Sequence, residues 1–156
     1  MNSNTESQTV RVDLGPRSYD IDIASNQLAT CAQSVARWAK ASGITARQAF
    51  LVTDANVRHP HAEAVQQSLQ AAGWETHTAV VAAGEPSKSL DATSKLYDQL
   101  VEIEAGRQTV VIAVGGGVVG DLAGFVAATY TRGVPFIHIP TTLVAQVDRS
   151  VGGKVG

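Results

Sequence analysis

Hydrophobic and polar residues alternate near the start of the chain, and longer apolar runs appear further along. The alternation over Thr9 to Leu14 and over Tyr19 to Ile23, separated by the turn-forming Gly15-Pro16, predicts an antiparallel hairpin. The later apolar runs are flanked by loop residues, which is typical of buried parallel strands. We predict such strands at 49–53, 76–81, 109–114 and 134–139.

Amphipathic segments of helical length separate these strands. Asn26 is the predicted N-cap of the first helix, and Ser87 that of the third. Helices are expected at 26–41, 61–72, 88–104 and from the glycine-rich loop to 130, with a short helix after 142. The predicted fold class is therefore α/β, with a Rossmann-like parallel sheet, helices on both faces and an N-terminal hairpin. We expect residues 1–8 to be a disordered tail and residues 9–156 to form one domain.

The composition limits the partners that the chain can have. With 44% hydrophobic residues in 156, the chain can bury one core, and its 12 basic and 14 acidic residues include no basic tract. We therefore expect no nucleic-acid partner. No apolar run approaches the roughly 20 residues of a membrane span, so no membrane partner is expected. The single Cys31 and a polar N-terminus without a signal sequence predict a cytoplasmic location.

A glycine motif follows the strongly apolar strand at 109–114. Gly115, Gly117 and Gly120 fit the pattern G-x-G-x-x-G, whose glycines let the backbone approach a pyrophosphate at the start of a helix. The carboxylate that usually binds the ribose about 20 residues later is missing, because the sequence there reads IHIP. Two interpretations remain open: a dinucleotide site, and a tight strand-to-helix turn that simply needs glycine.

Other polar residues follow two of the predicted strands. Asp54 and Asn56 come directly after one strand, and Glu85 and Lys88 lie in the loop after the next. Because the carboxyl ends of parallel strands form one edge of a sheet, these side chains are candidates for binding a ribose or its base. The structural alternatives are capping by Asp54 and Asn56, and an exposed ion pair between Glu85 and Lys88.

The end of the chain is locally basic. Together with Thr141-Thr142, its charged residues suit an anionic phosphate, although a solvated surface cluster is the alternative. His138 lies in an apolar strand and is expected to be a core histidine with satisfied hydrogen bonds. No catalytic residue or metal ligand is assigned, since no nucleophilic or metal-binding constellation is predicted. The charged residues concerned are Arg132, Asp148, Arg149 and Lys154.

Several of these features occur in an order that resembles one enzyme family, the 3-dehydroquinate synthases. The segments GGGVVGDLAGFVAATYTRG and IPTTLVAQVDRSVGGK contain a glycine loop with its aspartate, A-A-T-Y-x-R-G, P-T-T-L and Q-V-D-x-S-V-G-G-K. Upstream, TDANV and GEPSK extend the resemblance over nearly the whole chain. The resemblance implies the NAD-binding domain of such an enzyme. The family's second, helical domain, which carries the metal ligands, lies outside this sequence.

The resemblance also implies roles for individual residues. One group would hold the adenosine part of NAD and so replace the missing carboxylate, a second would bind the pyrophosphate, and a third would lie near the nicotinamide. The implied cofactor-binding residues are Asp54, Asn56, Glu85, Lys88, Gly115, Gly116, Gly117, Val118, Gly120, Asp121, Thr141 and Thr142. The implied substrate-binding residues are Arg132, Asp148 and Lys154.

The implied activity converts 3-deoxy-D-arabino-heptulosonate 7-phosphate, a phosphorylated sugar acid, to 3-dehydroquinate and phosphate in the shikimate pathway. It needs NAD and, in the full-length enzyme, a divalent Zn or Co ion. The family implies a homodimer, and we expect the present chain alone to lack turnover. The alternatives are another sugar-phosphate cyclase, a metal-dependent polyol dehydrogenase and a stand-alone nucleotide-binding module.

Overall fold

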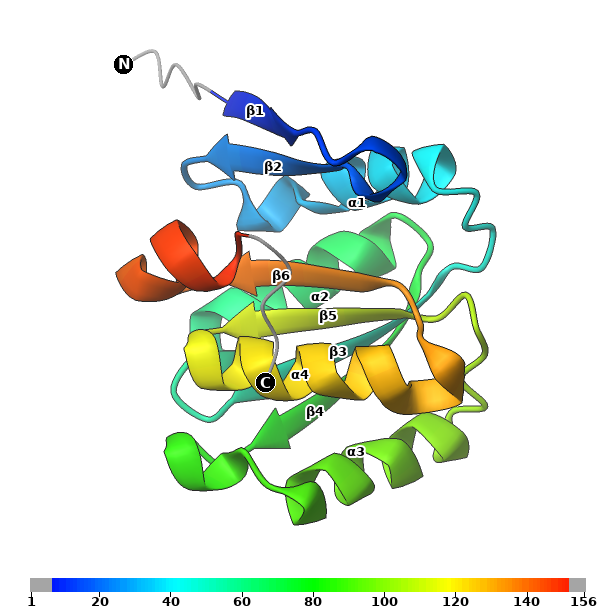
Figure 1. Ribbon diagram of the computed structural model, residues 1–156, viewed down its shortest axis with the longest axis vertical. Coiled ribbons are helices and arrows are strands. Elements are labelled where there is room, and N and C mark those ends of the chain that lie inside the picture. Colours follow the sequence, from blue (N-terminus) through cyan, green and yellow to red (C-terminus); the bar gives the residue numbers. More distant parts are fainter. Residues whose placement is uncertain (1–6, 152–156) are drawn as a thin grey trace.

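The structure is a computed structural model that describes residues 7–151 (Figure 1). It begins with a separate antiparallel ribbon of β1 (Ser7–Val12) and β2 (Tyr19–Ala24), joined through a helical turn at Gly15–Arg17. The predicted hairpin is confirmed, and β1 starts two residues before the predicted Thr9. An ion pair between Arg11 and Asp20 connects the two strands of the hairpin. A second, between Asp22 and Arg37, connects the hairpin to the first helix.

The central sheet has four parallel strands in the order β4-β3-β5-β6. This order places β3 and β5 in the middle, and the residues of β5 are buried along its whole length. The register brings the ends of the strands level, with Asp54 opposite Val81 and Gly115 opposite Pro140. The strands are β3 (Gln48–Asp54), β4 (Glu75–Val81), β5 (Val110–Gly115) and β6 (Phe136–Pro140).

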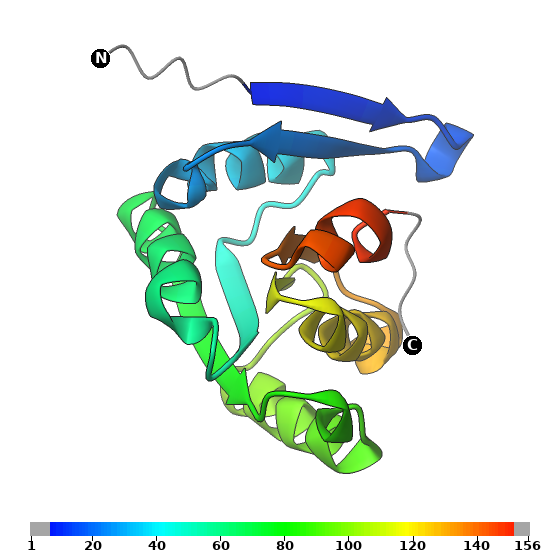
Figure 2. The same ribbon diagram turned by 90° about the vertical axis from the view of Figure 1, so that its left-hand side faces the viewer.

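Helices cover both faces of the sheet, as Figure 2 shows in a view onto the strand ends. Alternate strand residues point to opposite faces: Phe50 and Val52 pack with the side of α3 and α4, whereas Leu51 packs with that of α1 and α2. The Rossmann-like α/β prediction is therefore confirmed. The helices are α1 (Ala32–Ala41), α2 (Glu63–Ala71), α3 (Leu90–Glu102) and α4 (Gly117–Thr129).

Two predicted helix starts are wrong, for local reasons. Asn26 adopts a left-handed backbone with φ of 56°, so it cannot lead directly into a helix, and α1 begins only at Ala32 after a short turn at Leu28–Thr30. The N-cap of α3 is Ser89, whose hydroxyl accepts a hydrogen bond from the Ala92 amide at 3.2 Å. Ser87 is instead buried and donates to the Ala82 carbonyl.

Candidate functional site

The carboxyl ends of the four parallel strands form one edge of the sheet, and most of the predicted site residues lie along it. Asp54 ends β3, the turn η4 (Glu85–Ser87) follows β4, and Gly115 ends β5. Thr141 follows β6, and its amide donates to the Gly115 carbonyl at 3.0 Å. Because parallel strands share this edge, segments that are far apart in the sequence meet here.

The helix that begins at this edge has no side chain capping its N-terminus. The N-cap of α4 is Gly116, whose carbonyl accepts a hydrogen bond from the Gly120 amide at 3.0 Å. The amides of the first turn, Gly117 to Val119, therefore have no intrahelical acceptor. The contrast with α3, which Ser89 caps, shows that α4 begins with donors directed at the loop. Such an open N-terminus attracts an anion such as a pyrophosphate.

Close contacts explain why glycines are needed in this loop. A Cβ atom at Gly115 would lie 2.7 Å from the Cβ of Val119, and one at Gly116 would lie 3.1 Å from Cγ2 of Thr142. The first distance is shorter than real contacts allow, so Gly115 is required for the turn itself. The two interpretations of the motif are thus compatible, because the same glycines that permit the turn leave the helix start open.

An ion pair with a buried carboxylate connects the loop after β4 to α4. The Nζ atom of Lys88 lies 2.7 Å from Oδ2 of Asp121, whose side chain is 2% exposed, and 3.1 Å from Oε2 of Glu85. The hydrogen bond to Asp121 raises the pKa of Lys88 above its ordinary value, so this lysine is charged at neutral pH. The i,i+3 ion pair of Lys88 with Glu85, which was the structural alternative, is present. Lys88 therefore bridges the exposed carboxylate of Glu85 and the buried carboxylate of Asp121. The pairing of Lys88 with Asp121, 33 positions apart by their numbers, left no signal in the local sequence.

Asp54 shapes the loop after β3. Its Oδ1 atom accepts hydrogen bonds from the amides of Asn56 at 2.8 Å and Val57 at 3.2 Å. Asp54 therefore closes the turn after β3, as aspartate commonly does, but it does not cap a helix, because the next helical segment, η3 (Arg58–Ala62), has Val57 at its N-cap and no side-chain cap. Asn56 is exposed beside it.

The residues after β6 divide between the site and regions away from it. Thr142 contacts the loop at Gly116, and its hydroxyl accepts from the Ala145 amide at 3.2 Å, which starts the short helix η6 (Ala145–Arg149). The predicted short helix is thus confirmed. Asp148 belongs to η6, which packs against α4. Lys154, the other residue predicted there, lies outside the described residues.

Arg132 does not join the other predicted residues. It follows α4, whose 13 residues lead away from the glycine loop over about 20 Å. Arg132 therefore lies toward the amino edge of the sheet, beyond the reach of its own chain's glycine loop. The backbone there is unusual, since Thr131 and Arg132 both have positive φ, 46° and 71°.

His138 differs from the expectation of a fully hydrogen-bonded core histidine. It lies on β6, half-buried, and its Nε2 atom is buried without a hydrogen-bond partner among residues 7–151. Burial lowers the pKa of the imidazole from 6.5, although a hydrogen bond with the Gly115 backbone and the nearby Asp121 carboxylate raise it. The sequence could have indicated its position, because the two-residue period places it on the same face as Phe136, toward α4.

We predict that His138 makes the stability of the protein pH-dependent. Because its folded-state pKa lies below the unfolded value of 6.5, its stabilising effect is complete above that pH and is lost as the pH falls through the folded-state pKa. Urea unfolding at about pH 7.5 and about pH 5.5 should show a larger acid-induced loss for the wild type than for His138→Asn. Equal losses in both proteins would contradict the assignment.

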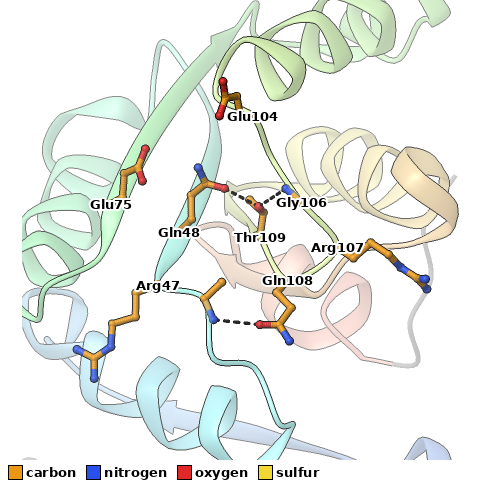
Figure 3. Close-up of a pocket in the computed structure, with 9 residues that line it drawn as sticks. Arg47, Gln48, Glu75, Glu104, Gly106, Arg107, Gln108 and Thr109 are labelled. Atoms are coloured by element: carbon orange, nitrogen blue, oxygen red, sulfur yellow. Dashed lines mark hydrogen bonds between the residues drawn. The ribbon is translucent and has the colours of Figure 1, made fainter.

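An open hollow of about 480 Å³ lies at the opposite, amino edge of the sheet (Figure 3). Several of its polar side chains bond to neighbouring loops: Thr109 donates to Gln48, and Oε1 of Gln108 accepts from the amides of Thr45 and Ala46. The Arg47 side chain donates to the Ala72 carbonyl, and Figure 3 shows Arg107 extending away from the hollow. These hydrogen bonds therefore join the loops at this edge of the sheet.

Between residues 7 and 151, no group of three histidine, cysteine, aspartate or glutamate side chains is arranged to hold a metal ion. In the same part of the chain, no helix has the length and apolar character to cross a bilayer.

Comparison with known proteins agrees with the geometry. The profile of the family described as 3-dehydroquinate synthase N-terminal matches residues 78–156. A 3-dehydroquinate synthase from Desulforamulus reducens is 53% identical over 147 residues, which are 94% of this chain and 40% of that protein. The chain spans about two fifths of the length of the curated relatives it matches.

Two solved structures of related cyclases extend the comparison. A 2-deoxy-scyllo-inosose synthase complexed with carbaglucose-6-phosphate, NAD+ and Co2+ is 25% identical, with a TM-score of 0.74 over 91% of this chain and 37% of that one. A 2-epi-5-epi-valiolone synthase from Streptomyces hygroscopicus subsp. jinggangensis 5008, with NAD+ and Zn2+ bound, is 33% identical. Its TM-score is 0.65 over 76% of this chain and 33% of that one. The family profile matches just over half of the sequence, including the glycine loop at the carboxyl edge of the sheet. This match shows that the chain belongs to the 3-dehydroquinate synthase family.

Proposed function

We propose that this chain forms the NAD-binding part of a 3-dehydroquinate synthase. The observation that carries the proposal is the uncapped start of α4, which meets the buried Lys88–Asp121 pair at the carboxyl edge of a parallel sheet. A glycine loop with free amides suits a pyrophosphate, and flanking carboxylates suit ribose hydroxyls. The residues present therefore fit a dinucleotide.

In this proposal the cofactor lies along the edge from β3 to β6. The amides of Gly117 and Val118 bind the pyrophosphate, and the adenosine lies toward Asp54 and Glu85. The remaining residues assigned to the adenosine and nicotinamide sides are Asn56, Lys88, Asp121, Thr141 and Thr142. When bound, NAD supplies a temporary acceptor for a hydride of the substrate.

The proposed substrate is 3-deoxy-D-arabino-heptulosonate 7-phosphate. Support comes from the 53% identity to a 3-dehydroquinate synthase, against 25% and 33% to the two cyclases named otherwise. Asp148 and Lys154 are assigned to this substrate. Because Arg132 cannot reach the glycine loop of its own chain, we assign it to the site of a second copy in a homodimer.

NAD titration by calorimetry tests the proposal. The 156-residue chain is expected to bind NAD, and to bind NADP more weakly because Asp54 and Glu85 would repel its 2′-phosphate. Phosphate release from the proposed substrate, measured with NAD and a divalent ion present, is expected to be absent for this chain alone. Tighter binding of NADP than NAD would contradict the adenosine assignment, and no binding of either would contradict the proposed function.

A further inference from the structure

The ring of His138 lies directly against Gly120 of the glycine motif. A Cβ atom built on Gly120 would lie 2.5 Å from Cε1, 2.7 Å from Nε2 and 3.2 Å from Nδ1 of His138. These are the three nearest atoms, and all belong to the imidazole. Position 120 therefore requires glycine because the His138 side chain of β6 occupies the space that a Cβ atom would need.

The same ring also reaches the other end of the loop. It makes a hydrogen bond with the backbone of Gly115, and since Nε2 has no partner in the described part of the chain, Nδ1 is the nitrogen that can donate to that carbonyl. The Gly115 carbonyl also accepts from the Thr141 amide. One imidazole thus contacts the last residue of β5 and the first turn of α4.

We infer that His138 is a positioning residue of the dinucleotide site. It spaces the start of α4 from β6 through Gly120, and it fixes the Gly115 carbonyl, so that the amides after Gly116 point to the ligand. This inference rests on the proposed function and adds a residue that the family resemblance did not assign.

The surroundings of the ring explain why it acts as a neutral spacer. A protonated ring would place an Nε2 hydrogen in a buried position that has no acceptor. The charged groups on the elements packed against it are Asp121 of α4 and, through the ion pair with that residue, Lys88 of the β4–α3 loop. Their charges largely balance, and on the β6 side the neighbour is the Phe136 ring, with centroids 6.3 Å apart.

A double-mutant cycle tests the contact. Gly120→Ala is expected to shift the folding equilibrium toward the unfolded state by about 5- to 100-fold, because the added methyl group has no room beside the ring. His138→Asn keeps a donor for the Gly115 carbonyl and removes the ring edge. In that background, Gly120→Ala should cost several-fold less.

NAD affinity and amide hydrogen exchange test the positioning role. His138→Ala should weaken NAD binding by about three- to tenfold and speed exchange at the amides of residues 115–119, whereas His138→Asn should restore both. Additive effects in the cycle, or loss of stability in His138→Ala with unchanged exchange, would overturn the inference. If the wild type binds no NAD, the proposed function fails, while the cycle and the exchange rates still decide the role of His138.

Discussion

Replacing Lys88 with methionine is expected to lower the free energy of unfolding by about 2 kcal/mol and to abolish measurable NAD binding. The change keeps the apolar stem but removes the ammonium group that lies 2.7 Å from the buried Asp121 carboxylate. Removing one partner of a fully buried ion pair costs more than this, but Lys88 itself is 24% exposed, so water reduces the loss. Urea unfolding and calorimetry with NAD measure the two effects.

Lys95 provides a matched control for this prediction. Its ammonium group also lies 2.7 Å from an aspartate, Asp91, but both side chains are exposed, by 69% and 76%. Lys95→Met should therefore change the stability by less than about 0.5 kcal/mol and leave NAD binding unchanged. Adding Asp121→Asn to Lys88→Met should recover part of the stability, since the buried charge that has lost its lysine partner is then gone. Similar losses for the two lysines would show that burial of Asp121 has no energetic role.

Replacing Gly115 with alanine is expected to destabilise the protein by about 2 to 3 kcal/mol. The new methyl group would lie 2.7 Å from Cβ of Val119, a residue that is 1% exposed and held in the first turn of α4. Relief requires α4 to move away from β5, which would also displace the amides of the glycine loop. We therefore expect NAD binding to be lost together with stability, and thermal unfolding with NAD titration checks both.

Gly106 is the control for this change. A Cβ atom there would meet nothing within 4 Å, and its φ is not in the left-handed region. Gly106→Ala is expected to be neutral or to stabilise the protein by roughly a few tenths of a kcal/mol, because alanine lowers the conformational entropy of the unfolded chain. If both alanine variants behave alike, the tight contact at the start of α4 does not exist in solution.

The fold was predictable because it is encoded in strong periodic patterns. The continuous apolar run of β5 indicates a strand that is buried on both faces, and the alternation in the hairpin indicates two strands with one polar face each. Both patterns can be recognised from consecutive residues alone. The helix starts were less predictable, because several residues can cap a helix. Ser87 and Ser89 are both suitable caps, and only the path of the loop decides that Ser89 performs the role.

The candidate site was predictable only as a set of segments at one sheet edge. The strand ends placed Asp54, Glu85 and Gly115 together, since parallel strands share an edge. The contacts between those segments depend on packing, so the bonds of Lys88 with Asp121 and the contact of His138 with Gly120 were not foreseen. The resemblance grouped Arg132 with the other site residues, but the length of α4 separates it from them.

The most direct test of the NAD-binding account is a titration of the isotopically labelled chain with NAD, followed by amide NMR shifts. The largest shifts are expected at residues 115–119 and at Lys88, with smaller ones at Asn56 and Thr141. No shift is expected around Gln48 and Gln108, which line the hollow at the amino edge. Saturable shifts confined to that hollow, with an unchanged glycine loop, would contradict the account.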